Sequence, residues 1–130
     1  MIDNFSKNLK FDENGLITVI VQDYRSSDVL MVAYMNKEAI DVTLKTKKAT
    51  FWSRSRKSLW VKGEISGNTQ EVIEFYYDCD GDSILLKVNQ IGIASCHTGR
   101  KTCFFTKVLF DGSIKIISEQ LFDPDEIYKK

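Results

Sequence analysis

The chain has 130 residues, 43% of them hydrophobic and 28% charged, which is typical of a soluble globular domain and excludes a disordered or fibrous protein. Eighteen basic residues balance eighteen acidic ones, so no net field attracts nucleic acid or an anionic membrane, and any phosphate recognition has to be local. This length suits one hydrophobic core, and we expect residues 1–130 to form a single domain.

The N-terminal residues 1–15 have neither the apolar run of a secretory signal nor the arginine-rich character of a transit peptide. Every apolar run in the chain is interrupted before the roughly 18 residues that a membrane span needs. We therefore expect a cytoplasmic protein that does not interact with membranes. Because disulfides are disfavoured in the cytosol, the three cysteines are candidates for metal binding or catalysis, with buried inert thiols as the alternative.

Two strands and one helix are expected in the first third of the chain. Residues 16–21 and 29–34 are rich in β-branched and aliphatic residues, and the polar residues 23–28 between them predict a hairpin. Asn36 can cap a helix that begins at Lys37, since apolar residues recur at helical spacing after it.

The rest of the chain has the pattern of short strands, over residues 49–53, 59–62, 72–77, 84–89, 104–110 and 114–118. Asp80-Gly81 and Asp111-Gly112 are turn signals, and the second is typical of a tight hairpin. Asp123 followed by Pro124 predicts a short helical turn near the end. These elements predict an α+β, β-rich fold, a barrel-like or sandwich β-sheet capped by one or two helices.

Aromatic and basic residues are mixed between residues 51 and 64. Arg54 and Arg56 can bind phosphate through paired hydrogen bonds, and a ring such as Trp52 can stack on a base. Such a stretch also resembles a platform for single-stranded nucleic acid, but the balanced net charge favours a small phosphorylated ligand. The alternative without function is that Trp52 and Trp60 fill the core while the arginines face solvent.

Three carboxylates and a thiol gather in Asp78, Cys79, Asp80 and Asp82. Carboxylate oxygens suit Mg²⁺ or Ca²⁺, whereas a thiolate suits Zn²⁺. If the preceding strand stays extended through Asp80, its aspartates lie on one face and Cys79 lies on the other. An acidic turn without a metal is the alternative.

A second group of candidate ligands lies near residue 100. Cys96 and Cys103 are seven positions apart, and Gly99 between them allows the loop to fold back. With Cys79 they would make a three-thiolate site that leaves one position of zinc open for water, as in catalytic zinc sites. Unconnected buried thiols are the alternative. His97, the single histidine, can transfer a proton, bind zinc as a fourth ligand or play a structural role.

Taken together, these segments resemble the phosphoribosyl-AMP cyclohydrolase family from about residue 21 to about residue 105. The motifs that carry the resemblance stand in the family's order: VLMVAYMN at 29–36, FWSRSR at 51–56, LWVKGEISG at 59–67, QEV at 70–72, DCDGD at 78–82, VNQIG at 88–92, CHTG at 96–99 and Cys103-Phe104. Ser95 stands where alanine is expected and Thr102 where serine is usual, and neither departure removes a ligand.

The resemblance implies a homodimer in which Cys79 of one subunit and Cys96 and Cys103 of the other bind Zn²⁺. It also implies that Mg²⁺ is bound by three aspartates, Asp78, Asp80 and Asp82. The implied activity is a step of histidine biosynthesis on a small phosphorylated nucleotide, in which water adds to C6 of the adenine ring and the N1–C6 bond breaks.

The resemblance also orders the candidate catalytic residues, with His97 first and Glu64 second for proton transfer. Four residues are candidates for substrate binding: Trp52, Arg54, Arg56 and Lys62. Two other functions stay open. A zinc-dependent base deaminase is the enzyme alternative, although its usual ligand pattern is absent, and a non-catalytic nucleic-acid module is the binding alternative.

Overall fold

The structure of the chain is a computed structural model that describes residues 5–92 and 98–117. Its elements are η1 (Ser6–Asn8), β1 (Ile17–Asp23), β2 (Val29–Met35), α1 (Lys37–Thr46), β3 (Thr50–Ser53), β4 (Ser58–Val61), β5 (Gln70–Tyr77), β6 (Ser83–Gln90), β7 (Thr106–Val108) and β8 (Ile114–Ile116). Cys96, His97 and the helical turn expected near Pro124 lie outside the described residues.

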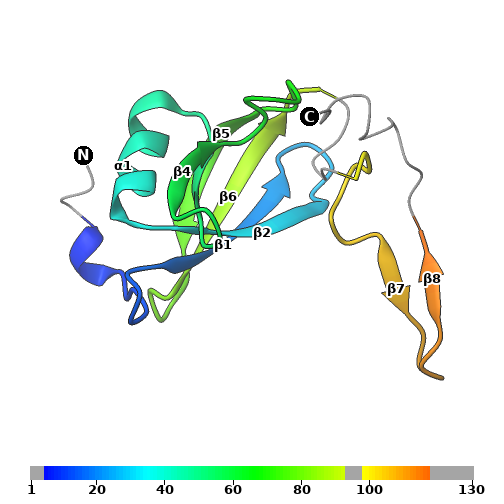
Figure 1. Cartoon of the computed structure of the whole chain (residues 1–130). Coiled ribbons are helices and arrows are strands. Elements are labelled where there is room, and N and C mark those ends of the chain that lie inside the picture. The colour runs from blue at the N-terminus through cyan, green and yellow to red at the C-terminus, as the bar shows by residue number, and fades with distance from the viewer. Residues whose placement is uncertain (1–4, 93–97, 118–130) are drawn as a thin grey trace.

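Four strands form the main sheet, in the order β2-β1-β6-β5 (Figure 1). β1 pairs with β2 and β5 pairs with β6 in antiparallel fashion, whereas β1 and β6 are parallel. Two further hairpins, β3–β4 and β7–β8, complete the described strands. The expected α+β, β-rich fold is confirmed. Within the described residues the main sheet is open, with β2 and β5 at its edges, and it does not close into a barrel.

Helix α1 begins as the sequence predicts. The Asn36 side-chain oxygen accepts a hydrogen bond from the Ala39 amide at 2.8 Å, and Lys47 in the left-handed region ends the helix. The Thr43 hydroxyl donates to the Thr50 carbonyl at 3.2 Å and accepts from the Thr50 amide at 3.1 Å, which ties α1 to β3. No helix among the described residues combines the length and apolar character needed to cross a membrane.

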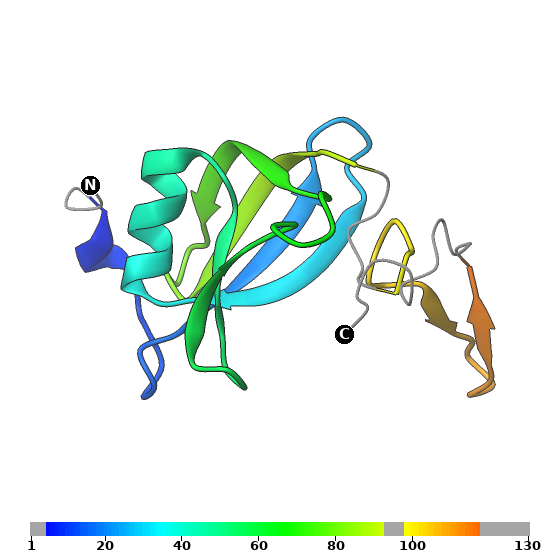
Figure 2. The same cartoon turned by 45° about the horizontal axis from the view of Figure 1, so that its top comes forward.

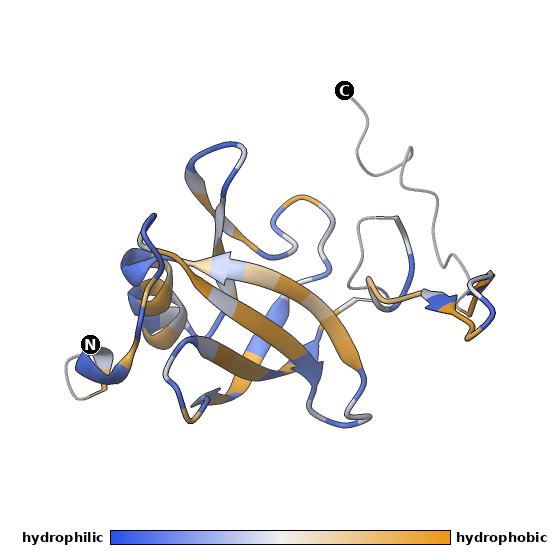
Figure 3. Cartoon of the chain, turned by 90° about the horizontal axis from the view of Figure 1, so that it is seen from below, coloured by the Kyte–Doolittle hydropathy of each residue, from blue (hydrophilic) through white to orange (hydrophobic). Residues whose placement is uncertain are grey.

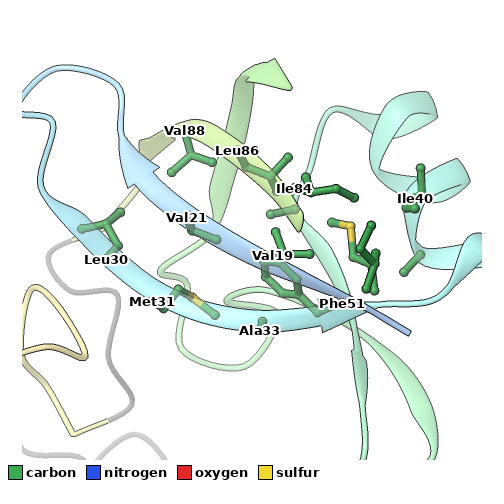
Figure 4. Close-up of a cluster of buried hydrophobic side chains, with 14 of the residues drawn as sticks. Val19, Val21, Leu30, Met31, Ala33, Ile40, Phe51, Ile84, Leu86 and Val88 are labelled. Atoms are coloured by element: carbon green, nitrogen blue, oxygen red, sulfur yellow. The ribbon is translucent and has the colours of Figure 1, made fainter. Parts of the chain in front are cut away.

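The core lies between one face of the main sheet and the layer formed by α1 and the β3–β4 hairpin (Figure 4). Alternate residues of β1 and β6 point into it, including Val19, Val21 and Leu86, each of which has no exposed surface. Phe51 of β3 is equally buried, and its ring centroid lies 5.1 Å from that of Trp60. Burial of each such side chain stabilises the fold by about 1.5–3 kcal/mol, which fixes β3–β4 against the sheet.

The opposite face of the main sheet carries an apolar row that crosses all four strands. The register places Val32 beside Ile20, Ile20 beside Leu85, and Leu85 beside Tyr76. Val32 is 42% exposed and Tyr76 is 45% exposed. A half-exposed apolar row on a sheet is typical of a face that another layer covers. We call this face of the main sheet, with its row Val32, Ile20, Leu85 and Tyr76, the open sheet face.

The β7–β8 hairpin projects away from the main sheet (Figures 1 and 2). Thr106 pairs with Ile116 and Val108 pairs with Ile114, so these side chains share one face of the hairpin. That face is exposed in the single chain, and apolar residues recur along the hairpin as they do along the main sheet (Figure 3). An isolated two-stranded hairpin is marginally stable in water, so this exposed apolar face is a candidate contact surface.

Candidate functional site

The strongest candidate site is a cavity of about 390 Å³, which we call the thiol cavity. It joins segments that are far apart in the sequence: β2, the β3–β4 hairpin with the turn after it, and the segment before β7. Its lining residues are Met31, Arg56, Trp60, Val61, Lys62, Gly63, Glu64, Ile65, Ser66 and Cys103. A thiol, a carboxylate and two cationic side chains thus lie around one space, and all four residues were predicted from the sequence as site residues: Arg56, Lys62, Glu64 and Cys103.

Hydrogen bonds to the start of β2 place Cys103 at this cavity. The Cys103 amide donates to the Leu30 carbonyl at 2.7 Å. The hydroxyl of Thr102 donates to the carbonyls of Val29, at 2.6 Å, and Leu30, at 3.1 Å. The segment that carries the exposed Cys103 side chain is therefore anchored to β2 by the Cys103 amide and by the Thr102 hydroxyl just before it.

An ion pair next to Cys103 holds the same segment on the β1–β2 turn. Lys101 Nζ donates to Asp28 Oδ2 at 2.7 Å. The hydrogen bond from Lys101 lowers the pKa of Asp28, with a further contribution from Ser26. The same hydrogen bond raises the pKa of Lys101. Both groups therefore stay charged over a wider pH range than free side chains do.

A second cavity of about 930 Å³ adjoins the first, and we call it the basic cavity. It is lined by residues of β2 and β3 and by the β3–β4 turn: Met31, Val32, Ala33, Tyr34, Trp52, Ser53, Arg54, Ser55, Arg56 and Trp60. Met31, Arg56 and Trp60 line both cavities, so an elongated ligand can occupy the two together.

The arginines of the basic cavity are positioned by specific contacts. The guanidinium carbon of Arg54 lies 4.0 Å from the centre of the Tyr34 ring, a favourable cation–π arrangement. The Arg56 amide donates to the Ser53 hydroxyl at 3.2 Å. The sequence analysis identified both arginines as candidate site residues but not Tyr34. The position of Tyr34 between two buried residues of β2 indicates that its side chain points away from the core, and this pattern could have identified it. Trp52 is half-buried at this cavity rather than in the core.

The three aspartates of the predicted magnesium site lie together at the β5–β6 turn. One carboxylate oxygen from each of Asp78, Asp80 and Asp82 lies within 4.8 Å of the other two, and all three residues are exposed. The Asp78 carboxylate accepts hydrogen bonds from the amides of Asp82, at 3.1 Å, and Ser83, at 3.3 Å. An all-oxygen group of this size suits Mg²⁺.

The pKa values of these carboxyls move in opposite directions. A hydrogen bond and charge repulsion from Asp78 raise the pKa of Asp82, with smaller effects of desolvation and Asp80. Desolvation acts to raise the pKa of Asp78, but hydrogen bonds from Asp82, Ser83 and Gly81 together lower it. Repulsion of this kind is what a bound cation relieves.

The path of the chain at this turn differs from the expectation. Strand β5 ends at Tyr77, and residues 79–82 form a turn, so the backbone does not stay extended through Asp80. The interpretation that strand alternation separates the aspartates from Cys79 is therefore wrong. The turn itself brings the carboxylates together. Gly81, with φ of +73°, allows the turn to pack against η1, since a Cβ there would lie 2.1 Å from the Asn8 carbonyl oxygen.

Cys79 and Cys103 lie at opposite ends of the main sheet. Cys79 is in the turn before Ser83. Ser83 and Tyr34 both pair with Thr18 of β1, so they lie at the same level along the strands of the sheet. Cys103 is bound to Leu30, four residues from Tyr34 along β2. Four residues of strand span about 13 Å, whereas two sulfurs on one zinc ion lie at most about 4.6 Å apart. Within one chain these two thiols cannot share an ion.

Comparison with known proteins adds independent evidence. A family model described as phosphoribosyl-AMP cyclohydrolase matches residues 31–105. A protein of Chlorobium phaeovibrioides named phosphoribosyl-AMP cyclohydrolase is 52% identical over 127 residues, which cover 98% of this chain and 92% of that protein. A relative of the same name from an Azoarcus species is 52% identical over 92% of this chain and 92% of its own length. Another, from Pelotomaculum thermopropionicum, is 51% identical over 95% of this chain and 95% of its own length.

Proposed function

This chain belongs to the phosphoribosyl-AMP cyclohydrolase family, and we propose that it hydrolyses phosphoribosyl-AMP in histidine biosynthesis by opening the adenine ring. The observation that carries the proposal is the match over nearly the whole chain to relatives that bear this name. The two adjoining cavities support it, because one holds a thiol and a carboxylate and the other holds two arginines.

The shape of the two cavities suits a base that carries phosphorylated ribose on both sides. We place the base in the thiol cavity, where Trp60 can stack on it. One ribose phosphate would then lie in the basic cavity, where Arg54 and Arg56 can bind its oxygens. Lys62, which is only 7% exposed, would add positive charge beside the base. The nucleic-acid alternative has less support, since a chain without net positive charge lacks the long-range attraction on which such binding depends.

Three thiolates would hold Zn²⁺ in this proposal: Cys79 of one subunit with Cys96 and Cys103 of the other. Zn²⁺, when bound, supplies a water with a pKa near 7 as the nucleophile for C6. The N1 of the substrate carries a ribose, so its ring is cationic and C6 is electrophilic. Addition of water to C6 breaks the N1–C6 bond, and N1 has to gain a proton as it leaves.

Proton transfer to N1 is the role that we propose for His97, with Glu64 as the second candidate. Glu64 lines the same cavity as Cys103, so its carboxylate is within reach of a base bound there. A positioned acid or base of this kind contributes about 10²–10⁴-fold to a rate.

We propose that the enzyme is a homodimer, because Cys79 and Cys103 of one chain lie too far apart to share zinc. A second copy also gives a partner to both exposed apolar surfaces, the open sheet face and the apolar face of the β7–β8 hairpin. In a two-fold symmetric dimer both copies would bury each of these surfaces, because the same patch of each chain lies in the interface. The sharing of zinc would bring the aspartates beside Cys79 next to the thiol cavity of the partner, where Mg²⁺ on Asp78, Asp80 and Asp82 can neutralise a substrate phosphate.

Incubation of the purified protein with phosphoribosyl-AMP tests this function. We expect the absorbance of the opened imidazole product to rise in the presence of Zn²⁺ and Mg²⁺, without release of ammonia. Ammonia release would instead indicate a deaminase. Salt-sensitive binding of oligonucleotides without turnover would support the nucleic-acid module. A cytoplasmic location remains part of the proposal.

A further inference from the structure

A single glutamine side chain joins the end of β6 to the turn that walls the thiol cavity. The Nε2 amide of Gln90 lies within hydrogen-bond distance of three carbonyl oxygens, those of Asn68, at 3.0 Å, Thr69, at 3.1 Å, and Ile91, at 3.0 Å, which share its two hydrogens. In addition, the Ile91 amide donates to the Thr69 carbonyl at 2.8 Å. Two segments more than twenty residues apart are thereby tied together through their backbones.

A second glutamine completes this arrangement. Gln70 faces Gln90 across the β5–β6 ladder, and its Nε2 donates to Gln90 Oε1 at 3.0 Å. Because three carbonyls surround Gln90 Nε2, Gln90 has to present its oxygen to Gln70. Gln70 is therefore the donor, and its own Oε1 is buried without a hydrogen-bond partner. Such an unsatisfied buried oxygen is rare in folded proteins and calls for an explanation.

Two glycines allow the tied segments to pack this closely. A Cβ on Gly63 would lie 2.3 Å from the Asn68 carbonyl carbon, and a Cβ on Gly92 would lie 2.0 Å from Asn68 Oδ1. Asn68 is 5% exposed between them. A side chain at Gly92 would push Asn68 away from the end of β6, and a side chain at Gly63 would open the turn from within, so both close approaches are requirements of this part of the fold.

The turn held in this way carries candidate residues of the site. Residues 62–66 form a wall of the thiol cavity, which Cys103 also lines. They include Lys62 and Glu64, whereas Gln70 and Gln90 line neither cavity. A displacement of about 1 Å in such a wall can reduce a rate about 10²-fold.

We propose that Gln90, held in orientation by Gln70, is a positioning residue that fixes the Lys62–Ser66 wall against the thiol cavity. This inference rests on the proposed function for its kinetic effect only. It explains why a buried amide is kept at position 70 although its oxygen has no hydrogen-bond partner: the donor is needed to orient Gln90, and an apolar residue of the same size cannot supply it.

The test compares Gln90→Met, which keeps the length of the side chain but removes the donor, with Thr43→Val as a matched control. Thr43 also bonds to backbone atoms from a buried position, and it lines neither cavity. Both variants should melt a few degrees below the wild type. At a temperature where both are folded, Gln90→Met should lower kcat/KM for phosphoribosyl-AMP about 10²-fold, while Thr43→Val stays within about twofold.

Hydrogen exchange measures the same effect without turnover. Amides between Gly63 and Thr69 should exchange at least tenfold faster in Gln90→Met than in the wild type, and at the wild-type rate in Thr43→Val. If the wild type does not open phosphoribosyl-AMP, the proposed function fails while this measurement still decides the positioning role. Unchanged exchange in Gln90→Met, or equal losses of kcat/KM in the two variants, overturns the inference.

Gln70→Leu gives a second route if Gln90→Met does not fold. It removes the buried unpartnered oxygen of Gln70 but also leaves Gln90 Oε1 without its donor, so the two effects offset each other and the melting temperature should stay within a few degrees of the wild type. The kcat/KM should nevertheless fall severalfold, because Gln90 loses the group that orients it. A Gln70→Leu enzyme with wild-type kcat/KM contradicts the role of Gln70.

Discussion

Polar substitutions on the apolar face of the β7–β8 hairpin should dissociate the proposed dimer. Val108 is 69% exposed and Ile114 is 65% exposed in the single chain. Full burial of such a side chain stabilises by about 1.5–3 kcal/mol, so burial of the exposed two-thirds contributes about 1–2 kcal/mol. Two residues in each of two arms then contribute about 4–8 kcal/mol, and Val108→Ser with Ile114→Ser should raise the dimer Kd by about 10³-fold or more.

Sedimentation over a range of protein concentrations measures this Kd directly. The matched control is Lys107→Ser with Lys115→Ser, because these two residues pair on the opposite face of the same hairpin. The control should remain as dimeric as the wild type, and the apolar-face variant should lose activity at concentrations where it is monomeric. A Val108→Ser/Ile114→Ser protein that dimerises as tightly as the wild type would show that this face lies outside the interface.

Three further predictions address the metals, the proton transfer and the placement of Cys103. Asp80→Asn should weaken the Mg²⁺ dependence of the rate but leave one zinc per site, because hard and soft ligands bind different ions; zinc loss from a folded variant, measured by atomic spectroscopy, argues against two sites. His97→Asn should keep zinc but lower kcat by about 10²–10⁴-fold; a near-native kcat and pH profile would direct attention to Glu64. Asp28→Asn should lower kcat/KM by loosening the segment that holds Cys103. Because Lys101 lowers the pKa of Asp28, the ion pair stabilises the folded protein fully at a pH above the ordinary carboxyl pKa, and this stabilisation is lost as the pH falls through the lowered pKa of Asp28. A wild-type kcat/KM in Asp28→Asn contradicts this role.

The elements with strong local signals could be predicted from the sequence. The expected strand at residues 29–34 and the helix that begins at Lys37 agree with β2 and α1 within one residue, since hydrophobic pattern and capping are local properties. The strand expected over residues 104–110 shortens to Thr106–Val108. The parallel pairing of β1 with β6 could not be predicted, because it joins strands separated by the 59 residues 24–82.

The candidate site was predicted by residue type but not by position. Basic and aromatic residues of the 51–64 stretch line the two cavities, and the three aspartates lie together. The sequence did not show that Glu64 and Cys103 line the same cavity, because this arrangement depends on the docking of the segment before β7 on β2. It also gave no role to Gln70 and Gln90, whose importance follows from hydrogen bonds between distant strands rather than from any local pattern.

The most direct test of the shared zinc site is activity in a mixture of two inactive variants, Cys79→Ala and Cys103→Ala. If each site draws Cys79 from one chain and Cys103 from the other, one site of every mixed dimer has all its thiolates. Random association of equal amounts then restores about one quarter of the wild-type turnover of phosphoribosyl-AMP. If mixed dimers form and the mixture stays inactive, the thiolates of each site come from a single chain and the account is wrong.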